Sequence, residues 1–77
     1  IMFYVRLMAY EFEDVGEPDA ETKAVFVNPM SISTFGPYAA NMPDITVISF
    51  AGSEDVMFVA GNYDQVNTLL TNTARMN

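Results

Sequence analysis

The chain has 77 residues, three basic and ten acidic side chains, and a formal net charge of −7. Nucleic acids and anionic membrane surfaces are bound mainly through clustered Lys and Arg, so this charge argues against both as partners. The sequence contains no Cys and no His, which excludes disulfides, thiol nucleophiles, imidazole metal ligands and the Ser-His-Asp triad.

The size and the apolar content of the chain together favour one domain, spanning 1–77, that associates with copies of itself. A domain this small buries only somewhat more than about 60% of its unfolded surface and is marginal as a monomer. Hydrophobic residues make up 51% of the sequence, which indicates a homo-oligomer. No apolar run approaches about 18 residues, so we predict no membrane span and a cytoplasmic protein.

The first predicted element is a strand over Met2–Tyr10, where side chains alternate at strand period. This segment lacks the basic n-region and the small-residue cleavage site of a signal peptide. The next segment, Glu11–Glu21, holds six of the ten acids and contains Gly16 and Pro18, which is typical of a surface loop. Its acids do not have the spacing of a calcium loop, so we predict no metal site and no cofactor.

Two further strands and a connection are predicted in the middle of the chain. Lys23–Asn28 is rich in β-branched residues, and Pro29 then forces a bend. Ser31–Phe35 resumes as a short strand. Gly36–Pro43 contains turn residues but is apolar for a loop, so we expect it to fold back onto the domain or to form a contact surface.

The last part of the chain predicts a hairpin and a helix. Ile45–Phe50 and Val56–Ala60 form the hairpin, and Asn62 with Gln65 has the spacing of a capping box. One stripe of the helix carries Tyr63, Val66, Leu69, Leu70 and Thr73. We expect the tail Asn72–Asn77 to fray. The predicted fold class is α+β, with a small antiparallel sheet of four to five strands and one C-terminal helix packed on one face.

A single helix covers one face of such a sheet, although both faces are apolar. We expect the helix to meet Val25, Val27, Val47, Val56 and Phe58. The opposite face then forms the oligomer interface, through Phe26, Ile48, Phe50, Met57 and Val59. Exchanging the two faces leaves the argument unchanged. Burial of each such side chain is worth about 1.5–3 kcal/mol, so a second layer from another subunit is expected.

Candidate binding groups gather near the apolar connection, whereas catalytic groups do not. The candidates for a ligand or partner site are Arg6, Ser33, Thr34, Phe35, Tyr38 and Asn41. Their hydroxyls, amide, rings and guanidinium suit a small nucleotide, although Arg6 pairing with a Glu across the sheet is the simpler interpretation. The adjacent carboxylates Glu13/Asp14 and Glu54/Asp55 do not face each other, so neither pair forms an acid–base dyad, and we predict no enzyme.

The segment from Val25 to Leu70 resembles small motility proteins of the FlbD/SwrD type and similar short phage-encoded proteins. The positions that carry the resemblance are Asn28, Ile32, Pro43, Asp44, Thr46, Ile48, Gly52, Val59 and Val66. The chain departs from the pattern in the acidic segment Glu11–Glu21, in the connection Gly36–Met42 and in the cap Gly61-Asn62. The resemblance implies a small, non-enzymatic, oligomer-forming accessory protein of bacterial or phage origin.

Three functions remain open from the sequence. The first is a homo-oligomeric binding module that regulates or inhibits a host protein by protein–protein interaction, through its acidic rim and apolar connection. The second is a phage-type anti-defence protein that sequesters a nucleotide signal at its subunit interfaces. The third is a structural subunit of a larger assembly.

Overall fold

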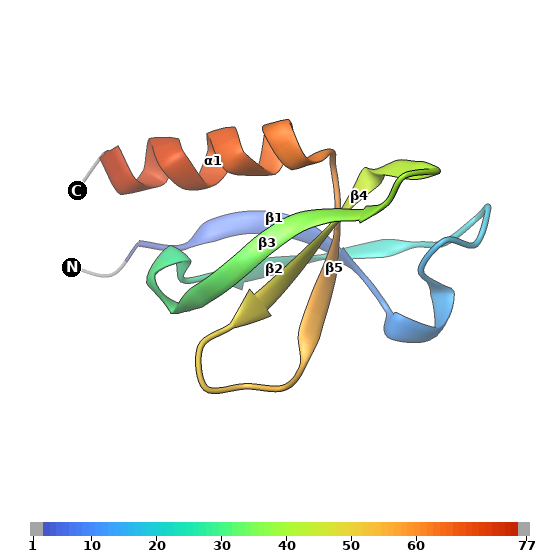
Figure 1. Cartoon of the computed structure of the whole chain (residues 1–77), viewed down its shortest axis with the longest axis horizontal. Coiled ribbons are helices and arrows are strands. Elements are labelled where there is room, and N and C mark those ends of the chain that lie inside the picture. The colour runs from blue at the N-terminus through green and yellow to red at the C-terminus, as the bar shows by residue number, and fades with distance from the viewer. Residues whose placement is uncertain (1–2, 76–77) are drawn as a thin grey trace.

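A computed structural model of the chain describes residues 3–75, with side chains to residue 72. It contains one five-stranded antiparallel sheet in the order β2-β1-β5-β4-β3, followed by a C-terminal helix (Figure 1). The strands are β1 (Val5–Tyr10), β2 (Thr22–Val27), β3 (Ile32–Ala39), β4 (Met42–Phe50) and β5 (Val56–Ala60). The helices are α1 (Tyr63–Arg75) and two short 3-10 turns, η1 (Phe12–Asp14) and η2 (Pro29–Ser31). The predicted α+β fold is confirmed.

Some sequence-based predictions lie outside the described residues. They are the start of the first strand at Met2, the end of the tail at residues 76–77 and the orientation of the Thr73 side chain. Within the described part of the chain, no helix is long and apolar enough to cross a membrane.

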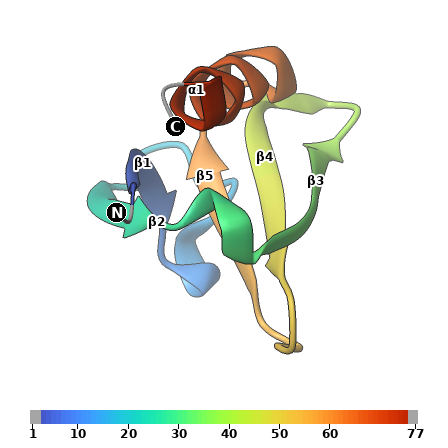
Figure 2. The same ribbon diagram turned by 90° about the vertical axis from the view of Figure 1, so that its left-hand side faces the viewer.

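The helix α1 lies along one face of the sheet, where the hydrophobic core forms (Figures 1 and 2). Its residues Val66 and Leu70 are buried against side chains from four strands. Those strand residues are Val5, Leu7, Ala9, Val27, Ile48 and Val59, with Val25, Ile32, Phe35, Phe50 and Met57 packed around them. The predicted stripe is therefore only partly buried, because Tyr63 and Leu69 remain exposed.

The predicted assignment of sheet faces is wrong for β4 and β5. Ile48 and Val59 are 0% exposed beneath α1, and Phe50 and Met57 pack against the same core. The reason is the pairing of Ala9 with Val59. Ala9 belongs to the core beneath α1, and directly paired residues of antiparallel strands share a face, so Val59 lies on the helix side as well.

The pairing of Ala9 with Val59 also determines on which face of the sheet the other residues of the two predicted sets lie. Val25 and Val27 lie on the helix side as predicted, whereas Val47, Val56 and Phe58 lie on the opposite, open face. Of the five predicted interface residues, Phe26 alone remains on the open face.

The segment Gly36–Pro43, predicted as a loop, is instead a β-hairpin. β3 continues through Gly36 and Pro37 to Ala39, and β4 begins at Met42. Pro37 is tolerated because β3 is an edge strand, where one side of the backbone has no ladder partner. The hairpin extends one end of the molecule, next to the acidic loop that follows β1 (Figure 1).

The predicted capping box at the start of α1 is confirmed. The Asn62 N–H donates to Gln65 Oε1 at 2.8 Å, and the Gln65 N–H donates to Asn62 Oδ1 at 2.9 Å. The two residues thus satisfy each other's backbone donors at a helix end. Gly61, with φ of +119°, makes the turn from β5 into this cap.

Candidate functional site

The open face of the sheet is partly covered by the chain itself. Phe58 on β5 is only 8% exposed, although α1 lies on the other side. The Phe12 ring of η1 lies 5.8 Å from the Phe58 ring, and the Tyr38 ring of β3 meets it edge-on at 5.4 Å. These contacts hold the acidic loop and the β3–β4 hairpin over the same part of the open face.

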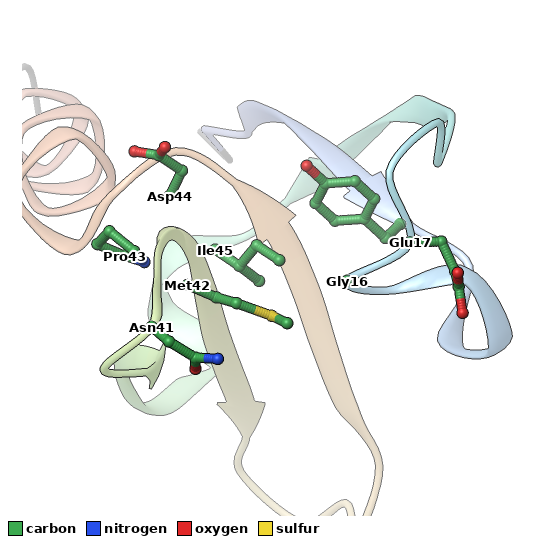
Figure 3. Close-up of a pocket in the computed structure, with 8 residues that line it drawn as sticks. Gly16, Glu17, Asn41, Met42, Pro43, Asp44 and Ile45 are labelled. Carbon is green, nitrogen blue, oxygen red and sulfur yellow. The ribbon is translucent and has the colours of Figure 1, made fainter.

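A cleft of about 260 Å³ lies between the acidic loop and the hairpin. Its lining is formed by Tyr10, Gly16, Glu17, Asn41, Met42, Pro43, Asp44 and Ile45 (Figure 3). Gly16 has φ of +88°, and a Cβ atom on it would lie 3.2 Å from Cε of Met42. A side chain at this position would strain the backbone and displace Met42, so the close approach of the loop to the hairpin depends on glycine.

The middle of the cleft is apolar, and its two acidic lining residues lie at the periphery. In Figure 3 the side chains of Met42 and Ile45 lie in the middle, while the side chains of Asp44 and Glu17 lie at opposite ends and point away from them. The side-chain amide of Asn41 points from the hairpin toward the loop side. Among the side chains that the structure describes, to residue 72, none that lines the cleft is basic.

The basic side chain nearest in sequence to the acidic loop is already paired. Lys23 Nζ lies 2.8 Å from Glu11 Oε1, so the two side chains form an ion pair. The hydrogen bond from Lys23 to Glu11, reinforced by the attraction of the two charges, raises the pKa of Lys23 above its usual value of 10.5. Both side chains are exposed and neither lines the cleft, so their ion pair does not change the charge of the cleft lining.

The structure does not bring the six predicted ligand residues into one site. Asn41 lines the cleft, and Tyr38 packs on Phe58 over the open face. Phe35 lies on the other side of the sheet, where its ring stacks on Tyr63 at 5.6 Å. Because side chains alternate between the two faces along β3, Phe35 and Tyr38 lie on opposite sides of the sheet.

The three remaining candidates also point elsewhere. Arg6 is exposed on β1 and is paired in register with Phe26 of β2. Thr34 Oγ1 forms a hydrogen bond with Ser49 Oγ on the neighbouring strand. Ser33 is exposed at an irregularity in the β3–β4 register. No phosphate-binding arrangement results from these positions.

The cleft was hard to predict from the sequence, because the residues that line it come from separate segments. Tyr10 ends β1, Glu17 belongs to the acidic loop, and Asp44 follows the hairpin turn. The available signal was Gly16, a glycine within an acidic loop, which indicates either a turn or a close approach of backbone to another group.

The two edge strands of the sheet differ in how they are protected. β3 carries Pro37, and its pairing with β4 shifts register near both ends. β2 contains no proline and pairs with β1 at six consecutive positions. On β2, Phe26 is 66% exposed. Proline and irregular pairing discourage strand addition, so β2 is the edge that is open to a further strand.

Comparisons of the chain with models of protein families, with curated proteins and with solved structures gave no match. The resemblance to FlbD/SwrD-type motility proteins therefore stays a prediction. Among the side chains that the structure describes, no group of three or more Asp and Glu residues is arranged to hold a metal ion.

Proposed function

We propose that the protein is a non-enzymatic, cytoplasmic binding module that forms homo-oligomers and regulates or inhibits another protein by binding it. The observation that carries the homo-oligomeric part of this proposal is the exposed Phe26 on β2, the edge strand without proline. An exposed aromatic ring beside unpaired backbone groups is a combination that soluble proteins usually avoid unless a partner covers it.

The partner that fits β2 most simply is the β2 strand of a second copy. Two such strands in antiparallel pairing give a twofold dimer with a continuous ten-stranded sheet. The segment Thr22–Val27 contains none of the ten acids, so the dimer seam stays free of their mutual repulsion. Burial of each Phe26 would contribute about 1.5–3 kcal/mol.

The two alternative functions have less support. Sequestration of a nucleotide requires convergent groups, and Arg6, Phe35 and Asn41 are distributed over both faces of the sheet. A structural subunit of a larger assembly requires growth at more than one surface, and the β3 edge is interrupted by Pro37. A closed dimer is the assembly that the edges favour.

Light scattering coupled to size-exclusion chromatography at micromolar concentration tests the proposal. The unmodified chain is expected to elute as a dimer, and Phe26→Glu as a monomer, because a charge would be buried at the seam. Met30→Glu is the matched control, since Met30 is 86% exposed on η2 and the charge change is the same. A monomeric unmodified chain would overturn the proposal.

A further inference from the structure

We propose that the second copy pairs with β2 in one register, with Val25 opposite Val25, and that Ala24 is the residue that receives the Phe26 ring of the other copy. This inference rests on the proposed function, because it specifies how the two β2 strands recognise each other. Three properties of β2 carry it: the symmetry of its pairing, its length, and the sizes and charges of its side chains.

The symmetry of a twofold dimer restricts the registers that are possible. Two copies of one strand run antiparallel in a continuous sheet when the twofold axis is perpendicular to the sheet, so each face of the dimer contains the same face of both copies. Directly paired residues share a face, and side chains alternate along β2, with Val25 and Val27 on the helix side and Phe26 on the open face. The axis must therefore pass beside a residue that lies opposite itself in the other copy.

The length of β2 favours two of these registers. The strand comprises Thr22–Val27. An axis at Ala24 or at Val25 pairs five residues of each copy, 22–26 or 23–27, whereas an axis one position further toward either end of the strand pairs only three. Each additional pair extends the ladder of backbone hydrogen bonds, so the two longer registers are favoured.

The Phe26 ring favours the axis at Val25. In that register Phe26 lies opposite Ala24 of the other copy, which is small and exposed and leaves room for the ring. The two Phe26 residues are then diagonal neighbours with Cα atoms about 7–8 Å apart, within reach of aromatic side chains. An axis at Ala24 instead separates the two Phe26 residues by four positions along the strand, or about 14 Å. Each ring, 66% exposed in the single copy, would then lack the cover of the other.

The charged residues near the seam favour the same register. An axis at Ala24 brings Glu21, which precedes β2, beside the buried Val27 of the other copy, where a carboxylate loses water without gaining a partner. It also places the two Lys23 residues at diagonal positions, about 7–8 Å apart at Cα, where like charges repel. An axis at Val25 moves the two Lys23 residues about 14 Å apart.

The register with Val25 at the axis makes the seam self-complementary. Phe26 of each copy covers Ala24 of the other on the open face, and two β-branched Val25 side chains meet on the helix side. The paired segment 23–27 contains no acidic residue. Ala24 is thus a residue that determines which strand can pair with β2, since a side chain larger than alanine at this position meets the incoming Phe26 ring.

The lack of cysteine in the chain permits a direct test, because one introduced cysteine is then the only thiol of each copy. Val25→Cys is expected to form a disulfide-linked dimer in oxidised glutathione, since opposite residues of antiparallel strands have Cα atoms within bridging distance. Ala24→Cys is the matched control, because diagonal Cα atoms lie too far apart for a bridge. The linked fraction, measured by non-reducing gel electrophoresis and mass spectrometry, is expected to be at least about tenfold larger for Val25→Cys.

Light scattering of the unmodified chain and of the reduced variants separates the two proposals. A dimeric Val25→Cys variant that stays unlinked, or an Ala24→Cys variant that links as readily, overturns the register and leaves the dimer in place. If the unmodified chain and both reduced variants are monomeric, the proposed function fails instead.

An isotope-filtered NMR experiment on a mixture of labelled and unlabelled copies reports the register without any substitution. A contact between the Phe26 rings of the two copies is expected, because the axis at Val25 makes them diagonal neighbours. A dimer in which the two Phe26 rings show no contact with each other contradicts the register, since an axis at Ala24 holds them about 14 Å apart.

Discussion

The hydroxyl of Thr46 donates a hydrogen bond of 2.9 Å to the backbone carbonyl oxygen of Gly61. Thr46 is 0% exposed and is a polar residue buried among the apolar side chains of the core. The Gly61 N–H in turn donates to the carbonyl oxygen of Asp44 at 2.8 Å. The residue that connects β5 to α1 is thereby attached twice to β4, so the position of the helix over the core depends on this junction.

Replacing Thr46 by valine is expected to destabilise the fold by about 1–2 kcal/mol. The two side chains have similar shapes, but valine leaves the carbonyl of Gly61 without its donor. Urea unfolding followed by circular dichroism measures the change. Thr22→Val on β2 is the control and should stay within about 0.5 kcal/mol, since Thr22 is only half-buried. An equal loss in both variants would mean that the hydrogen bond contributes nothing specific.

Replacing Gly61 by alanine is expected to cost about 1–3 kcal/mol, because φ of +119° is strained for any residue with a side chain. The new Cβ would meet Gln65 Oε1 at 3.5 Å, an ordinary contact, so the cost comes from the backbone rather than from a clash. Gly36→Ala is the matched control. Nothing lies within 4 Å of its added Cβ and its φ is not positive, so its stability should change little.

The elements that depend on local sequence were the ones that could be predicted. The capping box needs only Asn62 and Gln65 three positions apart, and the β4–β5 hairpin needs apolar alternation around Gly52, which has φ of +77°. The segment Gly36–Pro43 was misjudged because glycine and proline indicate turns, although an edge strand accepts both.

The faces of the sheet and the cleft depend on contacts between distant segments. Whether Ile48 or Val47 lies under the helix is decided by the pairing of Ala9 with Val59, and a shift of one residue would exchange the faces. The cleft likewise exists because Gly16 packs on Met42. Neither pairing is encoded in a local pattern, so composition and periodicity cannot reveal it.

The capping box predicts a non-additive mutational response. Asn62→Ala and Gln65→Ala are each expected to lower the free energy of unfolding by about 1 kcal/mol, because each removes an acceptor for a backbone donor. Since the two side chains support the same helix turn, the double variant should lose less than the sum of the single losses. Asn67→Ala in the middle of α1 is the control and should not destabilise the helix, since alanine has the higher helix propensity.

The ion pair between Lys23 and Glu11 predicts a specific response to pH. The pKa of Lys23 is raised in the folded protein by the hydrogen bond and charge of Glu11. A raised pKa means that the folded state holds this proton more tightly than the unfolded state does. Its contribution to stability is thus complete below pH 10.5 and is lost as the pH rises through the raised pKa.

The measurement is a titration of the Lys23 side chain followed by NMR. Glu11→Gln is expected to lower the pKa of Lys23 toward its ordinary value, since the charged partner is removed while a hydrogen-bond acceptor remains. Glu13→Gln removes the same charge from the same acidic loop and should leave most of the shift in place. If both variants lower the pKa of Lys23 equally, the cause is the overall negative charge of the loop and not the 2.8 Å contact.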